Sequence, residues 1–122
     1  MMKLLLVDDD GFLRDMYALK FSQAGHEVEA VESPAKALSL LARNADFDII
    51  LLDMIMPGMT GVELMQAIRA EFPDLSAKYV VLSNQGQDED IEEAKKAGAV
   101  GYIIKARSIP SEVVKKVENF VK

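Results

Sequence analysis

The sequence contains no cysteine among its 122 residues, and this absence excludes two kinds of structure. Disulfide bonds cannot stabilise the fold, and no metal ion can be held by thiolate ligands. A chain without disulfides is compatible with a reducing compartment, so we expect a cytoplasmic protein.

Long apolar runs and blocks of basic residues are also absent. The apolar runs are about four residues long, whereas a membrane-spanning helix needs about 20, and residues 4–7 are too short for the apolar core of a signal peptide. The chain carries 20 acidic and 14 basic residues, which gives a formal net charge of −6. We therefore expect no direct partner that is a membrane or a nucleic acid, whereas an acidic domain suits a divalent cation.

Four short apolar runs are present, and their continuous pattern is typical of strands that are covered on both faces. A fifth segment, residues 26–31, alternates polar and apolar side chains for most of its length, as a half-exposed strand at a sheet edge does. The length and the 50% hydrophobic content predict one compact domain over residues 1–122. The four runs are Leu4–Val7, Ile49–Leu52, Tyr79–Leu82 and Tyr102–Ile104.

Segments with the helical spacing of apolar residues lie between the predicted strands. Strict alternation of five strands with five helices predicts parallel βαβ units joined by right-handed crossovers. The fold class that follows is α/β, a three-layer sandwich with helices on both faces of the sheet. The helical segments lie before Gly25, after Ser33, between Gly61 and Pro73, at residues 88–97 and at residues 109–120, with Ser33 and Ser108 as expected N-caps.

Polar residues stand where the four continuous runs end. In an open parallel sheet, ligands bind beyond the carboxyl ends of the strands, so these residues are expected to share one rim. Taken singly, each has an ordinary explanation as a turn residue, a helix cap or a solvated strand end. Their joint occurrence favours a site of three carboxylates, one hydroxyl and one amine: Asp8, Asp9, Asp53, Ser83 and Lys105.

The chemistry of this set points to phosphoryl transfer. Neighbouring carboxylates raise one another's pKa, and Mg²⁺ removes that penalty because it prefers hard oxygen ligands. A lysine and a hydroxyl beside the metal can contact the oxygens of a phosphoryl group. Asp53 stands alone at its strand end and is the expected nucleophile, whereas Asp8 and Asp9 are placed to hold the metal.

Asp10, His26 and the methionines are expected to have structural roles. Asp10 is more suited to capping the helix that starts near Gly11 than to binding metal. His26 lies on the expected edge strand, away from the rim, and is expected to be a surface residue without a catalytic role. The methionines are expected to fill gaps in the core and loops; they include Met54, Met56, Met59 and Met65.

With these residues in hand, the chain resembles the receiver domains of two-component response regulators, in the single-domain form of the chemotaxis and sporulation regulators. The motifs VDDDG, LLDMIMPGMTG, VLSN and GYIIKA match the family pattern in order. Separations of 44, 30 and 22 residues between Asp9, Asp53, Ser83 and Lys105 also fit it. The resemblance implies a flavodoxin-like, doubly wound sheet of strand order 2-1-3-4-5.

The resemblance also implies roles for individual residues. Asp53 would accept the phosphoryl group, with Mg²⁺ held by Asp8, Asp9, Asp53 and the backbone carbonyl of Ile55. Ser83 and Lys105 would contact the phosphoryl oxygens. These implied site residues are Asp8, Asp9, Asp53, Ile55, Ser83 and Lys105.

The resemblance implies that the protein is a phosphorylation-dependent signalling switch rather than an ordinary enzyme. Ser83 would turn inward on phosphorylation and the aromatic ring of Tyr102 would follow, changing the affinity of the last helices and strand for a downstream protein target. A sensor histidine kinase or a phosphotransfer protein would supply the phosphoryl group. Gln85 and Ile55 occupy positions that tune how fast the acyl phosphate hydrolyses in the family.

One departure from the family pattern lies directly after the lysine. The family usually has a proline in a cis bond there, whereas this chain has Ala106, and a cis bond before a residue other than proline costs about 3 kcal/mol. We expect phosphorylation to be retained and the shape of the loop at residues 106–108 to differ.

Three other functions compete with the switch. Asp8 to Gly11 also fits the start of haloacid-dehalogenase-like phosphatases, in which Asp8 would be the nucleophile and Asp10 the general acid, although Phe12 stands where that family has threonine. A pseudo-receiver scaffold would be favoured if Asp53, Ser83 or Lys105 were missing, and none is. A flavodoxin-like cofactor binder would need a phosphate-binding loop in place of the three aspartates.

Overall fold

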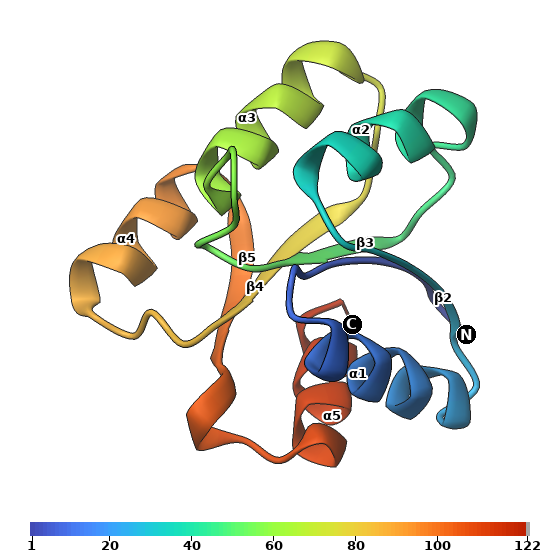
Figure 1. Ribbon diagram of the computed structural model, residues 1–122, viewed down its shortest axis with the longest axis vertical. Helices are drawn as coiled ribbons and strands as arrows, with labels where there is room; N and C mark the ends of the chain where they lie inside the picture. Colours follow the sequence, from blue (N-terminus) through green and yellow to red (C-terminus); the bar gives the residue numbers. More distant parts are fainter. Residues whose placement is uncertain (122) are drawn as a thin grey trace.

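The computed structural model describes residues 1–121 and contains one parallel sheet. All neighbouring strands pair in parallel, in the order β2-β1-β3-β4-β5, as predicted (Figure 1). Each strand that follows a helix therefore joins the sheet with its carboxyl end at the same edge. The strands are β1 (Lys3–Val7), β2 (Glu27–Val31), β3 (Ile49–Leu52), β4 (Lys78–Ser83) and β5 (Ala99–Ile104).

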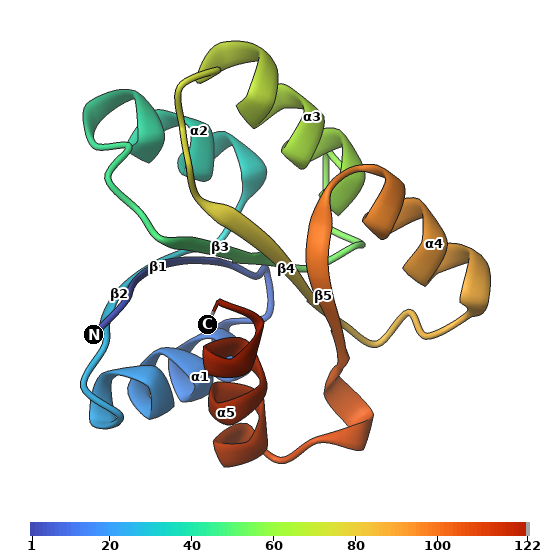
Figure 2. The ribbon, with the colours of Figure 1, turned by 180° about the vertical axis from the view of Figure 1, so that it is seen from behind.

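Helices cover both faces of the sheet, which confirms the predicted three-layer sandwich. Two helices, α1 and α5, lie side by side on one face, and α2, α3 and α4 lie on the other (Figures 1 and 2). A short 3₁₀ turn, η1 (Lys105–Arg107), separates β5 from the last helix. The helices are α1 (Gly11–Gln23), α2 (Pro34–Arg43), α3 (Gly61–Glu71), α4 (Asp88–Lys96) and α5 (Pro110–Phe120).

Alternate residues of the central strands fill two separate hydrophobic cores. On β1, Leu5 packs in the core under α2, α3 and α4, whereas Leu4 and Leu6 pack in the core under α1 and α5. All four residues of β3 are buried for the same reason, because both faces of that strand are covered. The strand β2 lies at the edge of the sheet and has no fully buried residue, so the predicted half-exposed edge strand is confirmed as well.

The predicted caps are mostly confirmed. The Asp10 side chain accepts a hydrogen bond from the Leu13 N–H at 3.0 Å, and Ser33 accepts one from the Lys36 N–H at 3.2 Å. The expected cap Ser108 is wrong, because α5 begins at Pro110 and its cap position is residue 109. Pro110 at the first helical position moves the start one residue beyond the reach of Ser108, whose hydroxyl instead lies 2.6 Å from Lys116 Nζ.

The interpretation of His26 as a surface residue is also wrong. Its side chain is only 8% exposed, and Nε2 lies 2.7 Å from Glu118 Oε2 on α5. Its Nδ1 accepts a hydrogen bond from the Met2 N–H at 3.0 Å. The alternating pattern could not show this burial, because α5 covers the histidine from a segment 92 residues away in the sequence.

The methionine interpretation is confirmed, since Met54, Met56 and Met65 are buried in the core on the α3 side and Met59 packs against it. Within residues 1–121, no helix is both long and apolar enough to cross a lipid bilayer.

Gly61 allows α3 to begin close to the end of β3. An ideal Cβ built on Gly61 would lie 2.3 Å from the backbone oxygen of Asp53, and the Gly61 N–H donates a hydrogen bond to the Met54 carbonyl at 2.8 Å. Any larger residue must therefore push the helix away from the backbone that carries Asp53. The Thr60 and Glu63 side chains cap this helix start reciprocally, which anchors it in place.

We predict that Gly61→Ala lowers the free energy of unfolding by about 1–3 kcal/mol, because the methyl group overpacks against backbone that has no freedom to move. Urea denaturation measures the loss. Gly11→Ala is the matched control, since its Cβ would meet nothing closer than an Arg14 nitrogen at 3.6 Å. Equal stability of the two variants would contradict the proposed close approach.

Candidate functional site

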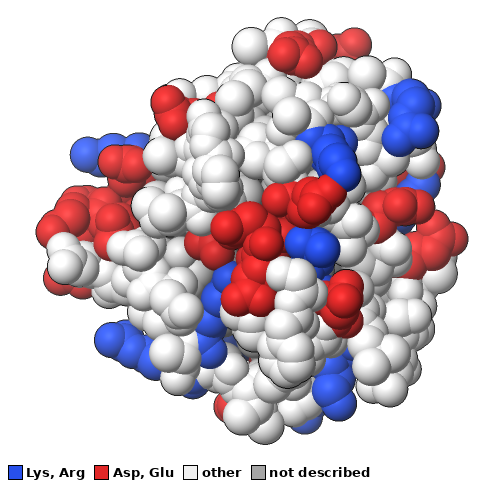
Figure 3. All heavy atoms as spheres, in the orientation of Figure 1, with Lys and Arg blue, Asp and Glu red and all other residues white. Residues whose placement is uncertain are grey.

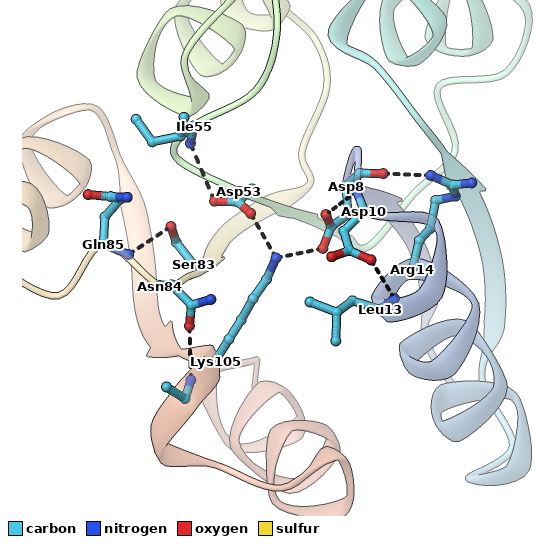
Figure 4. A network of polar contacts seen from close by, with 11 residues as sticks. Asp8, Asp10, Leu13, Arg14, Asp53, Ile55, Ser83, Asn84, Gln85 and Lys105 are labelled. Atoms are coloured by element: carbon cyan, nitrogen blue, oxygen red, sulfur yellow. Dashed lines mark hydrogen bonds and ion pairs between the residues drawn. The ribbon is translucent and has the colours of Figure 1, made fainter.

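The carboxyl ends of β1, β3, β4 and β5 bring the predicted rim residues together (Figure 4). Asp8 and Asp53 directly follow their strands, Ser83 is the last residue of β4, and Lys105 is the first residue of η1. Acidic side chains gather near the middle of this face with basic side chains beside them (Figure 3). The predicted convergence of distant residues on one rim is therefore present in the fold.

Lys105 bridges the two buried aspartates. Its Nζ donates hydrogen bonds to Asp8 Oδ2 at 2.8 Å and to Asp53 Oδ2 at 2.7 Å. Burial lowers the pKa of Lys105, but the hydrogen bonds and negative charges of Asp53 and Asp8 outweigh that effect and raise the pKa above its ordinary value. The lysine is therefore a fixed positive charge between two carboxylates at neutral pH.

Three carboxylates are close enough to share one metal ion. One oxygen from each of Asp8, Asp9 and Asp53 lies within 4.8 Å of the others. Asp8 and Asp53 are buried, whereas Asp9 is exposed and free to turn toward a cation. A set of hard oxygen donors open to water on one side fits Mg²⁺, which retains several of its waters in protein sites.

The remaining oxygens of Asp8 and Asp53 are held by backbone groups. Asp8 Oδ1 accepts the Asp10 N–H at 3.0 Å, and Asp53 Oδ1 accepts the Ile55 N–H at 3.3 Å. Ile55 is 58% exposed, and its backbone N–H, not its side chain, contacts Asp53. The role of its backbone carbonyl as a metal ligand stays a prediction.

Arg14 belongs to this site although the sequence motifs did not include it. Its Nη1 donates to the Asp8 carbonyl at 2.9 Å and so holds the loop that carries Asp8 and Asp9 (Figure 4). The one sequence feature that indicated this contact is the position of Arg14, about one turn into the helix that follows the aspartates. Periodicity alone does not distinguish a side chain that folds back toward the strand end from one that points to water.

Ser83 and Tyr102 are linked through the β4–α4 loop. Ser83 Oγ accepts the Gln85 N–H at 3.2 Å, and the Tyr102 hydroxyl donates to the Gln85 carbonyl. Tyr102 is half-buried; burial and, to a lesser extent, the negative charge of Asp90 raise its pKa to about 12. The tyrosine is therefore neutral at physiological pH and tied to the same residue as the serine.

Asn84 and Ala106 form a contact that sequence reasoning missed. Every peptide bond in residues 1–121 is trans, including the one between Lys105 and Ala106. The Ala106 N–H donates to Asn84 Oδ1 at 3.0 Å. The family that the sequence resembles usually has proline at this position, and proline has no backbone N–H to make this bond.

Comparison with known proteins assigns the family. A family model of the response regulator receiver domain matches residues 4–118. The chain belongs to this family. A chemotaxis protein CheY homolog of Campylobacter jejuni is 32% identical to this receiver domain over 119 residues, which cover 97% of the chain and 91% of that protein.

Solved and multidomain relatives agree with this assignment. The structure of chemotaxis protein CheY4 of Vibrio cholerae superposes with a TM-score of 0.88 at 31% identity, covering 98% of each chain. The response regulator protein FleR of Pseudomonas aeruginosa is 38% identical over 103 residues, 84% of this receiver domain, but the match spans only 21% of FleR. The rest of FleR lies outside the region that matches this receiver domain.

Membership of the family makes this receiver domain a phosphorylation signalling switch of a two-component system. The competing phosphatase interpretation is disfavoured by this family assignment. Asp10, the general acid of that interpretation, caps α1 through the Leu13 N–H.

In magnesium-free buffer, Lys105→Met is expected to lower the free energy of unfolding by about 2 kcal/mol, because two buried carboxylates lose their counter-charge. Added Mg²⁺ should reduce the difference from wild type by neutralising the same carboxylates. Lys95→Met, an exposed change on α4, is the matched control for net charge. A Lys105→Met protein as stable as the Lys95→Met protein would contradict the bridge.

The raised pKa of Lys105 also predicts a pH dependence. A lysine whose pKa is higher in the folded state stabilises the fold below its unfolded pKa of about 10.4, and this contribution is lost as pH rises through the folded value. The stability difference between wild type and Lys105→Met is therefore constant near neutral pH and shrinks above about pH 10.4. Urea titrations at a series of alkaline pH values measure it, and a difference that grows with pH would refute the assignment.

Proposed function

We propose that Asp53 accepts the phosphoryl group in this switch. The observation that supports this choice is the difference in access between the two buried carboxylates. The Asp53 side chain is 12% exposed at the mouth of the site, whereas that of Asp8 is 2% exposed and lies deeper. A phosphorus atom approaching from solvent meets an Asp53 oxygen first.

The donor is the phosphohistidine of a sensor histidine kinase or a phosphotransfer protein. An Asp53 carboxylate oxygen attacks phosphorus, the P–O bond forms, and the P–N bond breaks with its electron pair leaving on the imidazole nitrogen. Lys105, protonated because its pKa is raised, presents its ammonium group to the phosphoryl oxygens. Ser83 contacts another phosphoryl oxygen once its hydroxyl turns away from the Gln85 N–H.

Mg²⁺ is the cofactor that the donor set fits. Asp8, Asp9 and Asp53 would hold it together with the backbone carbonyl of Ile55. When bound, it supplies positive charge that offsets the negative charge of the transferred phosphoryl group. The chain's own part is to fix Asp8 through Lys105, Arg14 and the Asp10 N–H, so that the carboxylates are in place beforehand.

The signal leaves the site through Ser83 and Tyr102. When Ser83 turns toward the phosphoryl group, the Gln85 N–H loses its acceptor and the loop that also binds the Tyr102 hydroxyl is released. Phosphorylation thus shifts the population between two states of the face formed by α4, β5 and α5. A downstream protein target binds that face. Neither a nucleic acid nor a membrane is a direct partner.

This receiver domain acts as a signalling switch in the cytoplasm and catalyses its own phosphorylation and slow dephosphorylation. Gln85 and Ile55 flank the acyl phosphate and set its access to water. Ile55 follows Asp53 by two residues and is exposed, so its apolar side chain would hinder the approach of a water nucleophile when it turns over the acyl phosphate.

Incubation with acetyl phosphate, with and without Mg²⁺, followed by intact mass and mapping of the modified residue, tests the proposal. We expect one phosphoryl adduct that requires Mg²⁺, maps to Asp53 and disappears in Asp53→Asn.

Asp10→Asn is the matched control, because it makes the same chemical change in an aspartate that only caps α1, and it should keep the adduct. An adduct that survives in Asp53→Asn, or that maps to Asp8, would sink the proposal.

A further inference from the structure

We propose that Asn84 is a positioning residue for Lys105, acting through its hydrogen bond to the Ala106 N–H. The inference deepens the proposed function and rests on it for the reaction that Lys105 serves. This hydrogen bond joins the β4–α4 loop to η1 and so restrains the backbone next to the lysine.

The geometry places Asn84 at the point where β4 and β5 separate. Ser83 pairs with Ile104 as the last register pair of the two strands. One residue further on, Asn84 Oδ1 accepts the Ala106 N–H at 3.0 Å (Figure 4). A side-chain oxygen thus continues the ladder between β4 and β5 by one step, after the backbone of β4 has turned away toward α4.

This step matters for Lys105 because the bond that closes its turn is long. Lys105 opens the 3₁₀ turn, and the hydrogen bond from the Ser108 N–H to the Lys105 carbonyl is 3.5 Å long. A bond of that length contributes little. The Ala106–Asn84 bond is therefore the stronger restraint on the backbone from which the lysine side chain begins.

The lysine needs that restraint because its ammonium group must meet two acceptors at once. Nζ lies 2.8 Å from Asp8 Oδ2 and 2.7 Å from Asp53 Oδ2, on two different strands. A fixed backbone origin reduces the number of side-chain conformations open to the lysine, and so favours the one in which Nζ meets both oxygens. Asn84 supplies this restraint from the β4–α4 loop.

The same loop carries the serine of the switch. Asn84 lies between Ser83, whose hydroxyl accepts the Gln85 N–H, and Gln85, whose carbonyl accepts the Tyr102 hydroxyl. The Asn84 bond therefore connects the loop that responds to phosphorylation with the turn that bears the lysine. Both Asn84 and Ala106 are exposed, so water competes for their polar groups and the bond has the net strength of an ordinary neutral one.

The test compares Asn84→Ala with Asn84→Asp, which keeps an oxygen acceptor at the same reach from the backbone. Asn119→Ala, an exposed asparagine on α5, controls for the loss of an amide side chain. Three quantities are measured: hydrogen exchange of the Ala106 amide, exchange of the Lys105 ammonium protons by NMR of ¹⁵N-lysine protein, and the rate of phosphorylation by acetyl phosphate with Mg²⁺.

In Asn84→Ala we expect both exchange rates to rise and the phosphorylation rate to fall, each by about fivefold, the factor that one net hydrogen bond corresponds to. Asn84→Asp should keep the exchange of the Ala106 amide within about twofold of wild type, since it keeps the acceptor, and Asn119→Ala should keep all three quantities within that range, since it leaves the turn intact. All three variants should remain folded in urea titrations, and Asn84→Ala should lose no more stability than the fivefold factor of one net hydrogen bond.

An unprotected Ala106 amide in the wild-type protein would overturn the inference, because the bond would then be absent in solution. So would an Asn84→Ala protein whose Ala106 amide is freed while its Lys105 ammonium exchanges as in wild type. If wild type takes no phosphoryl group at Asp53, the proposed function fails, and the ammonium exchange alone decides whether Asn84 positions Lys105.

Discussion

The contact of Lys105 with Asp8 and Asp53 is the interaction on which the site depends. Parallel strand order brings two carboxylates to the same rim, and without compensation their repulsion would oppose the packing of β1 against β3. One ammonium group, delivered by β5, meets an oxygen from each. The fold therefore concentrates negative charge at a single point and neutralises it only in part, which leaves an opening that a divalent cation and a phosphoryl group can share.

The backbone around this contact is arranged to hold it still. Arg14 fixes the loop after β1 through the Asp8 carbonyl, and Gly61 lets α3 pack directly against the backbone of Asp53. The same rim leaves Asp9, Ile55 and Gln85 exposed. Rigid carboxylates surrounded by movable neighbours suit a site that must bind the same small group each time and report its presence to a protein partner.

Patterns of polarity were sufficient to predict the sheet and the identity of the rim residues. Continuous apolar runs such as Ile49–Leu52 reflect burial on both faces, and residues at the ends of such runs can lie nowhere but at the edges of the sheet. The Ala106–Asn84 bond, the return of Arg14 to Asp8 and the burial of His26 were not predictable, because each depends on which way one side chain turns between segments distant in the sequence. Ser108 failed as a cap because proline one position beyond the expected start shifted the helix by a residue.

The order in which the strands join the sheet has a consequence for how the protein acquires its chemistry. Asp8 and Asp53 lie on strands that pair with each other in the middle of the sheet, whereas the lysine between them follows the strand at the far edge. A chain emerging from the ribosome carries both carboxylates long before it carries their counter-charge. A partly synthesised chain therefore holds an acidic cluster without its counter-charge. The complete site forms only once β5 has joined the sheet, so that only a fully folded chain can take part in signalling.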